Sequence, residues 1–126
     1  MNDSGLYIVW LELDKPVSVR VGALGQLSFD PGLYAYVGSA QRNRSARIQR
    51  HLRREKPLRW HIDYLRPHGE IKEVTCYDGE RSDECRLVEE VIHKTGAHRS
   101  HPGFGASDCR CGGHLLLIPV KSGIMK

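Results

Sequence analysis

Two tyrosines each belong to a short glycine motif at the end of a predicted strand. Gly5-Leu6-Tyr7 opens an apolar stretch, and Tyr36-Val37-Gly38 closes a later one. A buried tyrosine normally finds a partner for its hydroxyl. Two hydroxyls that converge at strand ends can therefore position a water molecule or a phosphate. Taken alone, the pair is more simply explained as two core tyrosines.

Arg47 and His51 form a second candidate pair, four residues apart in a predicted helix. This spacing places both side chains on one flank of the apolar stripe made by Ile48 and Leu52. A guanidinium can bind two phosphate oxygens and stabilise the charge that develops in a transition state. An adjacent imidazole can relay a proton. In isolation, such a helical pair more often consists of two solvent-exposed side chains without a function.

Glu84 stands near the start of the most regular predicted helix, at an unusual position for a carboxylate. At about 100° per residue, the apolar positions between 87 and 91 centre close to Glu84, whereas Glu89 and Glu90 fall on the outer faces. A carboxylate on a core-facing stripe is costly unless it is paired, protonated or bound to a cation. A divalent metal would satisfy it and assist phosphodiester hydrolysis as a Lewis acid. The simpler alternative is a charge that serves the helix dipole.

Positive charge is concentrated in one segment. The net charge is +4, and only Glu55 opposes eight basic residues in that segment: Arg42, Arg44, Arg47, Arg50, Arg53, Arg54, Lys56 and Arg59. Such concentration is the electrostatic footprint of phosphate binding. We expect nucleic-acid contacts from Arg42, Arg44, Arg50, Lys56, Arg59 and His61, and the charge does not distinguish DNA from RNA. A solvated helix face is the alternative, and His61 and Asp63 could equally cap and pack a short helix.

The elements that must position these side chains follow from hydrophobic patterning. Strands are predicted over 5–13, 33–38, 71–77 and 115–120, and a strand pair over 17–29 that turns at Gly22 and Gly25. Helices are predicted from an N-cap at Ser45 to about Arg54, from Trp60 to Leu65, and over 82–94. Because strands and helices do not alternate regularly, we expect one α+β domain over residues 1–126, with a small, mainly antiparallel sheet flanked by helices.

Composition narrows the class of protein. The apolar fraction of 40% and the charged fraction of 27% are typical of globular domains. No apolar run approaches the roughly 20 residues of a membrane span, and the N-terminal residues do not resemble a secretory signal, so we expect a cytoplasmic protein without a membrane partner. The four cysteines are then expected to be free thiols or metal ligands. Zinc at Cys109, Cys111 and His114 is not favoured, because one residue between two cysteine ligands is tight.

The order of these motifs resembles the GIY-YIG nuclease superfamily, which includes excision-repair incision subunits, homing endonucleases and some restriction enzymes. The matching elements are GLY, YVG, R-I-x-x-x-H in a basic helix and E-x-x-L-V in a later helix. Residues 60–65, Glu84-Cys85 and the segment 103–116 resemble an uncharacterised branch, whose members occur alone or joined to an endonuclease-III-type repair protein. The resemblance covers nearly the whole chain.

The resemblance implies an endonuclease that hydrolyses DNA phosphodiester bonds in DNA repair or processing. By this resemblance, Tyr7 and Tyr36 flank the attacking water and one of them takes its proton. Arg47 holds the scissile phosphate, His51 assists, and Glu84 anchors a single Mg²⁺ or Mn²⁺. A free tyrosine has a pKa of about 10, so the base role requires nearby positive charge, which the arginine-rich helix can supply.

Two departures from the superfamily pattern leave rival functions open. About 28 residues separate Tyr7 from Tyr36, which requires an extra hairpin at roughly 14–31. Many relatives carry an asparagine after the metal-binding helix. Here the only asparagines are Asn2 and Asn43, so that role is missing or passes to Ser107, Asp108 or His114. The rivals are a catalytically inactive nucleic-acid-binding module of the same fold and a zinc-stabilised interaction domain.

Overall fold

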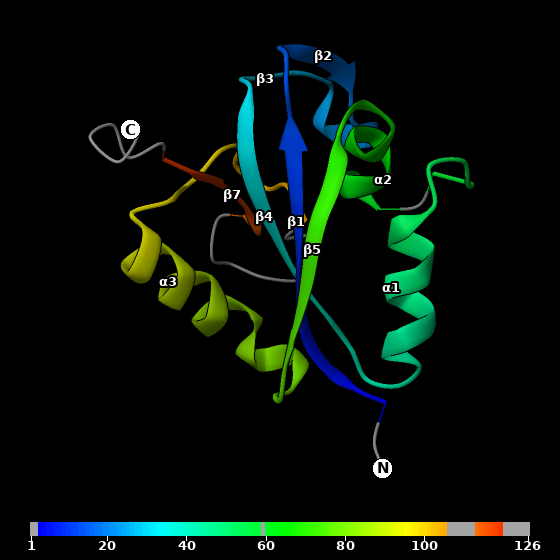
Figure 1. Cartoon of the computed structure of the whole chain (residues 1–126), viewed down its shortest axis with the longest axis vertical. Coiled ribbons are helices and arrows are strands. Elements are labelled where there is room, and N and C mark those ends of the chain that lie inside the picture. Colours follow the sequence, from blue (N-terminus) through cyan, green and yellow to red (C-terminus); the bar gives the residue numbers. More distant parts are fainter. Residues whose placement is uncertain (1–2, 59, 106–112, 120–126) are drawn as a thin grey trace.

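The computed structural model describes residues 3–58, 60–105 and 113–119 (Figure 1). Its strands are β1 (Gly5–Leu13), β2 (Val17–Arg20), β3 (Gln26–Phe29), β4 (Gly32–Ala40), β5 (Glu70–Tyr77), β6 (His98–Arg99) and β7 (Leu115–Ile118). Its α-helices are α1 (Arg44–Leu52), α2 (His61–Leu65) and α3 (Glu84–Thr95), and its short 3₁₀ turns are η1 (Gly22–Leu24), η2 (Arg66–His68) and η3 (Arg81–Asp83).

Five strands form one sheet in the order β5-β1-β4-β7-β6, and each neighbouring pair is antiparallel. The register of β1 and β4 pairs Tyr7 with Gly38 and Val9 with Tyr36. The strands β2 and β3 form a separate two-stranded hairpin. The predicted α+β class, with a mainly antiparallel sheet flanked by helices, is therefore confirmed.

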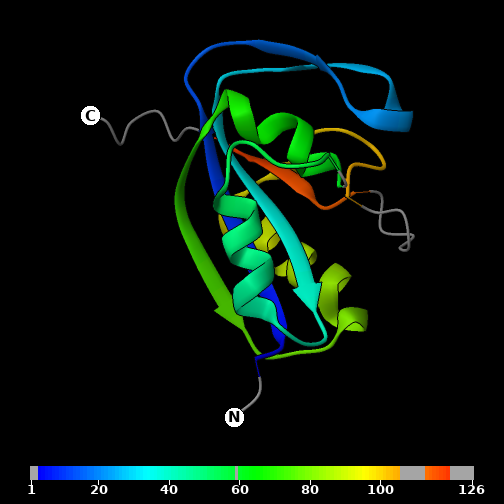
Figure 2. The same cartoon turned by 90° about the vertical axis from the view of Figure 1, so that its right-hand side faces the viewer.

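The sheet is covered on both faces, with α1 and α2 on one side and α3 on the other (Figures 1 and 2). Side chains along β4 alternate between these two layers. Tyr34 and Tyr36 join the core cluster that includes Ile62 of α2, whereas Ala35 and Val37 join the cluster made with α3. This strand therefore contributes side chains to both layers of the core.

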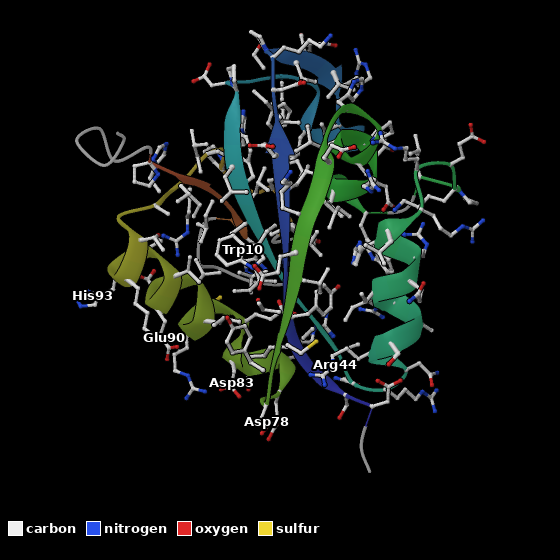
Figure 3. All side chains as sticks on the ribbon, in the orientation of Figure 1. Trp10, Arg44, Asp78, Asp83, Glu90 and His93 are labelled. Carbon is white, nitrogen blue, oxygen red and sulfur yellow. The ribbon has the colours of Figure 1, made fainter. Side chains whose placement is uncertain are left out.

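Helix α3 presents its apolar stripe to the sheet. Leu87 and Val88 are buried against it. Figure 3 shows Trp10 of β1 on the side of the sheet that faces α3, while Glu90 and His93 point away from the core. The first residue of this helix, Glu84, therefore starts on the face that turns inward.

The predicted extra hairpin lies between the two tyrosine motifs, as β2, η1 and β3. It contributes Val17, Val21 and Phe29 to the core cluster on the α1 and α2 side. The long spacing between Tyr7 and Tyr36 is therefore taken up by residues that add to the core, and β1 and β4 still pair directly.

The predicted ends of α1 are wrong. Ser45 lies inside the first turn, where its N–H and hydroxyl donate to Asp3 Oδ1 at 3.0 and 2.9 Å, and Asn43 is the cap residue with a left-handed φ of 57°. The helix ends at Leu52 instead of about Arg54, where Arg53 turns to an extended conformation, and Arg66 donates to the terminal carbonyls of residues 51 and 52. At the other end of the chain, β7 stops at Ile118, and Val120 lies outside the described residues.

Candidate active site

A cleft of about 1150 Å³ opens at the end of β4, on the edge where β7 stops. β7 pairs with β4 only from Leu33 to Tyr36, and one further hydrogen bond joins Val37 N–H to the His114 carbonyl. The residues of β4 beyond Val37 line the cleft. Figure 2 shows this end of the strand between α1 and the start of α3. Side chains from both faces of the sheet can therefore reach one space.

Four of the predicted site residues line this cleft together: Tyr7, Tyr36, Arg47 and Glu84. They come from β1, β4, α1 and α3, which are distant in the sequence. The fifth, His51, is 1% exposed and lies behind the tyrosines. The structure thus gathers the predicted residues at one location, with the imidazole behind the tyrosines and the other four groups at the cleft surface.

The two tyrosines and His51 form one buried aromatic group. The Tyr7 hydroxyl and His51 Nε2 are 2.8 Å apart, and the Tyr36 ring meets the imidazole edge-on with centroids 5.9 Å apart. Both phenols belong to the same core cluster, so they lie on one face of the sheet. Nδ1 of His51 is buried and, within the described part of the chain, has no hydrogen-bond partner. The hydrogen bond to Tyr7 is therefore the polar contact that orients this ring.

Burial controls the protonation of this group. Removal from water raises the pKa of Tyr7 and Tyr36 above the usual value, and the charge of Arg47, which acts in the opposite direction, is too weak to reverse this. Burial also lowers the pKa of His51 to about 4, and the positive charge of Lys56 adds to that effect. The expected net lowering of a tyrosine pKa by the arginine-rich helix is wrong, because desolvation is the larger effect. At neutral pH both phenols are protonated and the imidazole is uncharged.

Arg47 is held in place by the strand and by a tryptophan. Its Nη1 donates to the Ser39 carbonyl at 2.8 Å, and its guanidinium carbon lies 4.9 Å from the centre of the Trp60 ring. Arg50 also lies over Trp60, at 4.4 Å, and pairs with the buried carboxylate of Asp63 at 3.0 Å. The Asp63 carboxylate also accepts the Trp60 N–H at 2.9 Å. Asp63 therefore both caps α2 and orients an arginine.

Glu84 reaches the cleft from the opposite layer. Its side chain is 17% exposed, and its Oε2 accepts a hydrogen bond from the Ser39 hydroxyl. Its Oε1 lies 3.4 Å from Nδ1 of His114, which is 1% exposed. Burial lowers the pKa of His114, although the carboxylate of Glu84 opposes that shift. The carboxylate thus has a contact at each oxygen, and it borders the cleft.

The basic residues of the segment 42–59 divide into two groups. Arg42 is exposed and lines the cleft with Arg47. Three others make internal contacts. Arg44 Nη1 donates to the carbonyls of Leu6 and Tyr77, and Arg50 donates to Asp63 and Pro57. Lys56, whose side chain is 1% exposed, pairs with Asp63 and donates to the carbonyls of Arg50 and His51. Arg53 and Arg54 are exposed. His61 Nδ1 accepts the Gly105 N–H at 2.8 Å, and Arg59 lies outside the described residues. Much of the positive charge in this segment therefore supports the fold.

Sequence reasoning did not single out Ser39 or Trp60 as site residues. Ser39 directly follows the YVG motif, and Trp60 precedes α2, but neither type signals chemistry by itself.

Among the cysteines, Cys76 is exposed and free, whereas Cys85 is disulfide-bonded, so the expectation of free thiols or metal ligands is wrong for Cys85. Cys109 and Cys111 of the zinc hypothesis lie outside the described residues. The residues Ser107 and Asp108, which were considered for the missing asparagine, also lie outside them.

The fold and the cleft define a class of protein: an α+β domain in which phenols, a guanidinium and a carboxylate meet in one cleft at the end of a central strand. The chain belongs to the family described as the domain of unknown function DUF123, whose model matches residues 6–126. No curated protein and no solved structure matches the chain. Across the described residues, the helices lack the length and apolar content that a membrane span requires.

Proposed function

We propose that this chain is a divalent-metal-dependent endonuclease of the GIY-YIG type, which hydrolyses phosphodiester bonds of DNA. The observation that carries the proposal is the shared cleft, in which Tyr7, Tyr36, Arg47 and Glu84 meet although they come from different elements and both faces of the sheet. The order of the four motifs along the sequence supports the same reading.

Arg47 is the group that binds the scissile phosphate in this proposal. Its side chain lines the cleft, and the contacts with the Ser39 carbonyl and the Trp60 ring fix its position before a substrate arrives. A fixed guanidinium stabilises developing charge without reorganising in the transition state. Arg42 at the rim offers a second cation for a neighbouring phosphate.

Tyr7 and His51 form the route for the proton of the attacking water. A free phenolate is rare, since even a tyrosine with a pKa of about 10 is ionised in roughly one molecule per thousand at neutral pH. The Tyr7 oxygen instead accepts a proton from the water while its own proton passes to Nε2 of the neutral imidazole, 2.8 Å away. The negative charge of a phosphate in the cleft raises the pKa of His51 from about 4 toward its usual range.

The donors around Glu84 fit a hard divalent cation. Mg²⁺ prefers oxygen ligands, and it is commonly held by one or two carboxylates while several waters complete its shell. Glu84 would hold it, with the Ser39 hydroxyl supporting the carboxylate. Within residues 3–58, 60–105 and 113–119, no three metal-ligating side chains gather at one point, which fits a cation with a largely water shell. The bound cation would supply Lewis-acid stabilisation and a more acidic water.

The rival from another class is an inactive nucleic-acid-binding module of the same fold. One observation favours it: both phenols have raised pKa values, and the base that would accept their protons has a pKa of about 4. A domain with these groups can bind phosphate through its arginines without turning it over. A cleavage assay separates the two proposals.

The test is cleavage of supercoiled plasmid, nicked duplex and branched DNA, with matched RNA substrates, in Mg²⁺ or Mn²⁺. We expect metal-dependent cleavage that falls about 100-fold or more in Glu84→Gln, since loss of Lewis-acid assistance removes several kcal/mol of stabilisation. Glu90→Gln is the matched control on the same helix, because Glu90 points to solvent, and its rate should stay within about twofold. Cleavage that survives Glu84→Gln would overturn the metal assignment, and binding without cleavage would favour the rival.

A further inference from the structure

We infer that Ser39 is a positioning residue that orients two charged groups of the cleft, Glu84 toward a divalent cation and Arg47 toward the substrate phosphate. This inference rests on the proposed function and deepens it. It assigns to one strand residue the link between the carboxylate on the α3 side of the sheet and the guanidinium on the α1 side.

The two contacts leave Ser39 in different directions. Its side chain lies on the same face of β4 as Ala35 and Val37, the face that packs against α3. There its hydroxyl donates to Glu84 Oε2. Its carbonyl accepts the Arg47 Nη1–H at 2.8 Å, although Arg47 belongs to α1 on the other face. A strand carbonyl lies near the plane of the sheet, so at an edge it is accessible from the opposite layer.

The end of β7 makes this arrangement possible. Tyr36 is the last residue of β4 that pairs with β7, and Val37 makes one more bond to the His114 carbonyl. By the alternation of an antiparallel strand, the backbone of Ser39 points to the same edge as that of Val37. On this edge the Ser39 carbonyl accepts from the Arg47 guanidinium.

Burial strengthens the hydrogen bond from the Ser39 hydroxyl to the Glu84 carboxylate. Ser39 is 9% exposed and the Glu84 side chain 17% exposed, so water competes little for the carboxylate oxygen. Each carboxylate oxygen can accept more than one hydrogen bond or ligand, so the serine restrains the group without occupying all its lone pairs. Carboxylates that bind metals are usually hydrogen-bonded in this way, and loss of the supporting donor typically lowers metal affinity by about 10- to 100-fold.

Ser39→Ala separates the two contacts, because it removes the hydroxyl and leaves the carbonyl. We expect Mn²⁺ affinity, measured on the full chain by isothermal titration or by the electron paramagnetic resonance of free Mn²⁺, to fall about 10-fold or more. Affinity for a short DNA duplex in chelator should stay within about twofold, because the Arg47 contact persists. Ser39→Thr keeps a hydroxyl on a strand position that favours β-branched residues and should retain Mn²⁺ affinity within about threefold.

Ser82→Ala is the matched control, because Ser82 also lines the cleft. An unchanged Mn²⁺ affinity in Ser39→Ala overturns the inference, as does an equal loss in Ser82→Ala or a wild-type chain that binds no Mn²⁺. A wild-type chain whose Mn²⁺ binding depends on Ser39 and Glu84, but which cleaves no nucleic acid, supports the inference and refutes the hydrolase. Thermal unfolding of each variant confirms that the proteins compared are folded.

Discussion

The buried imidazole of His51 makes the stability of this domain sensitive to mild acid. The ring is 1% exposed and is bonded to Tyr7 through Nε2. Burial is the largest cause that lowers its pKa from 6.5 to about 4, with Lys56 and two arginines acting in the same direction and Asp63 opposing them. Protonation of the folded state must therefore place a second positive charge beside an existing buried cation.

The direction of the effect follows from proton binding in the two states. Between its unfolded pKa of 6.5 and its folded pKa of about 4, His51 binds a proton more readily in the unfolded chain. Stability is therefore complete above pH 6.5 and is lost as the pH falls toward 4. The loss from this one residue is about 2 kcal/mol by pH 5 and about 3 kcal/mol by pH 4.

Comparison of the wild type with His51→Gln isolates this contribution from the carboxylates that titrate in the same range. Urea unfolding of both proteins at several pH values between about 7 and about 4 gives the difference in free energy of unfolding. Glutamine can still meet the Tyr7 hydroxyl but does not titrate. We expect the advantage of the wild type to shrink by about 3 kcal/mol over this range. A difference that stays constant within about 0.5 kcal/mol would show that burial does not lower the pKa of His51 in the folded protein.

Two further predictions test how the cleft is built. Lys56→Met should lower stability by about 3 kcal/mol, because it leaves the buried Asp63 carboxylate short of a partner, and it should leave the salt dependence of DNA binding unchanged. Arg42→Ala is its matched control: its stability should stay within about 0.5 kcal/mol of the wild type, and the dependence of its DNA affinity on salt concentration should have a slope smaller by about 1. If Lys56→Met changes this slope and Arg42→Ala does not, Lys56 contacts DNA. Gly38→Ala would place a Cβ 2.7 Å from the Tyr7 phenol, so urea unfolding should show a loss of about 1–3 kcal/mol and cleavage should slow. Wild-type stability and a wild-type cleavage rate in Gly38→Ala would mean that the YVG glycine does not set the position of Tyr7.

The sequence predicted the inward start of α3 and each described strand except the short β6, although the strand predicted over 33–38 stopped before Ser39. The successful predictions follow from local periodicity. Alternation along a strand places Tyr36 and Val37 on opposite faces whatever the rest of the chain does. The apolar stripe of α3 likewise fixes the direction of Glu84 within its own helix. Such features need only short-range information, and the structure has them at the predicted positions.

Charge counting failed to separate structural cations from available ones. Lys56 and Arg42 contribute equally to the net charge of the basic segment, yet one side chain is buried beside Asp63 and the other lines the cleft. The difference depends on where α2 packs against the end of α1, which is a long-range contact. The protonation of Tyr7 was misjudged for a related reason, because nearby positive charge was considered without the larger effect of desolvation.

Among the described residues, the pairing of β7 with β4 ends before Ser39. His114 supplies the last bond to β4, and at Gly113 the backbone has a φ of 143°, a conformation that residues with a side chain rarely adopt. A Cβ at this position would lie 3.0 Å from the His101 carbonyl oxygen, so a larger residue would also be forced out of place. Gly113 thus fixes the backbone next to the last described bond between β7 and β4, and further along β4 the Ser39 carbonyl accepts from Arg47. A small sheet can then join groups from both of its faces, because a backbone carbonyl of one of its strands becomes part of the site.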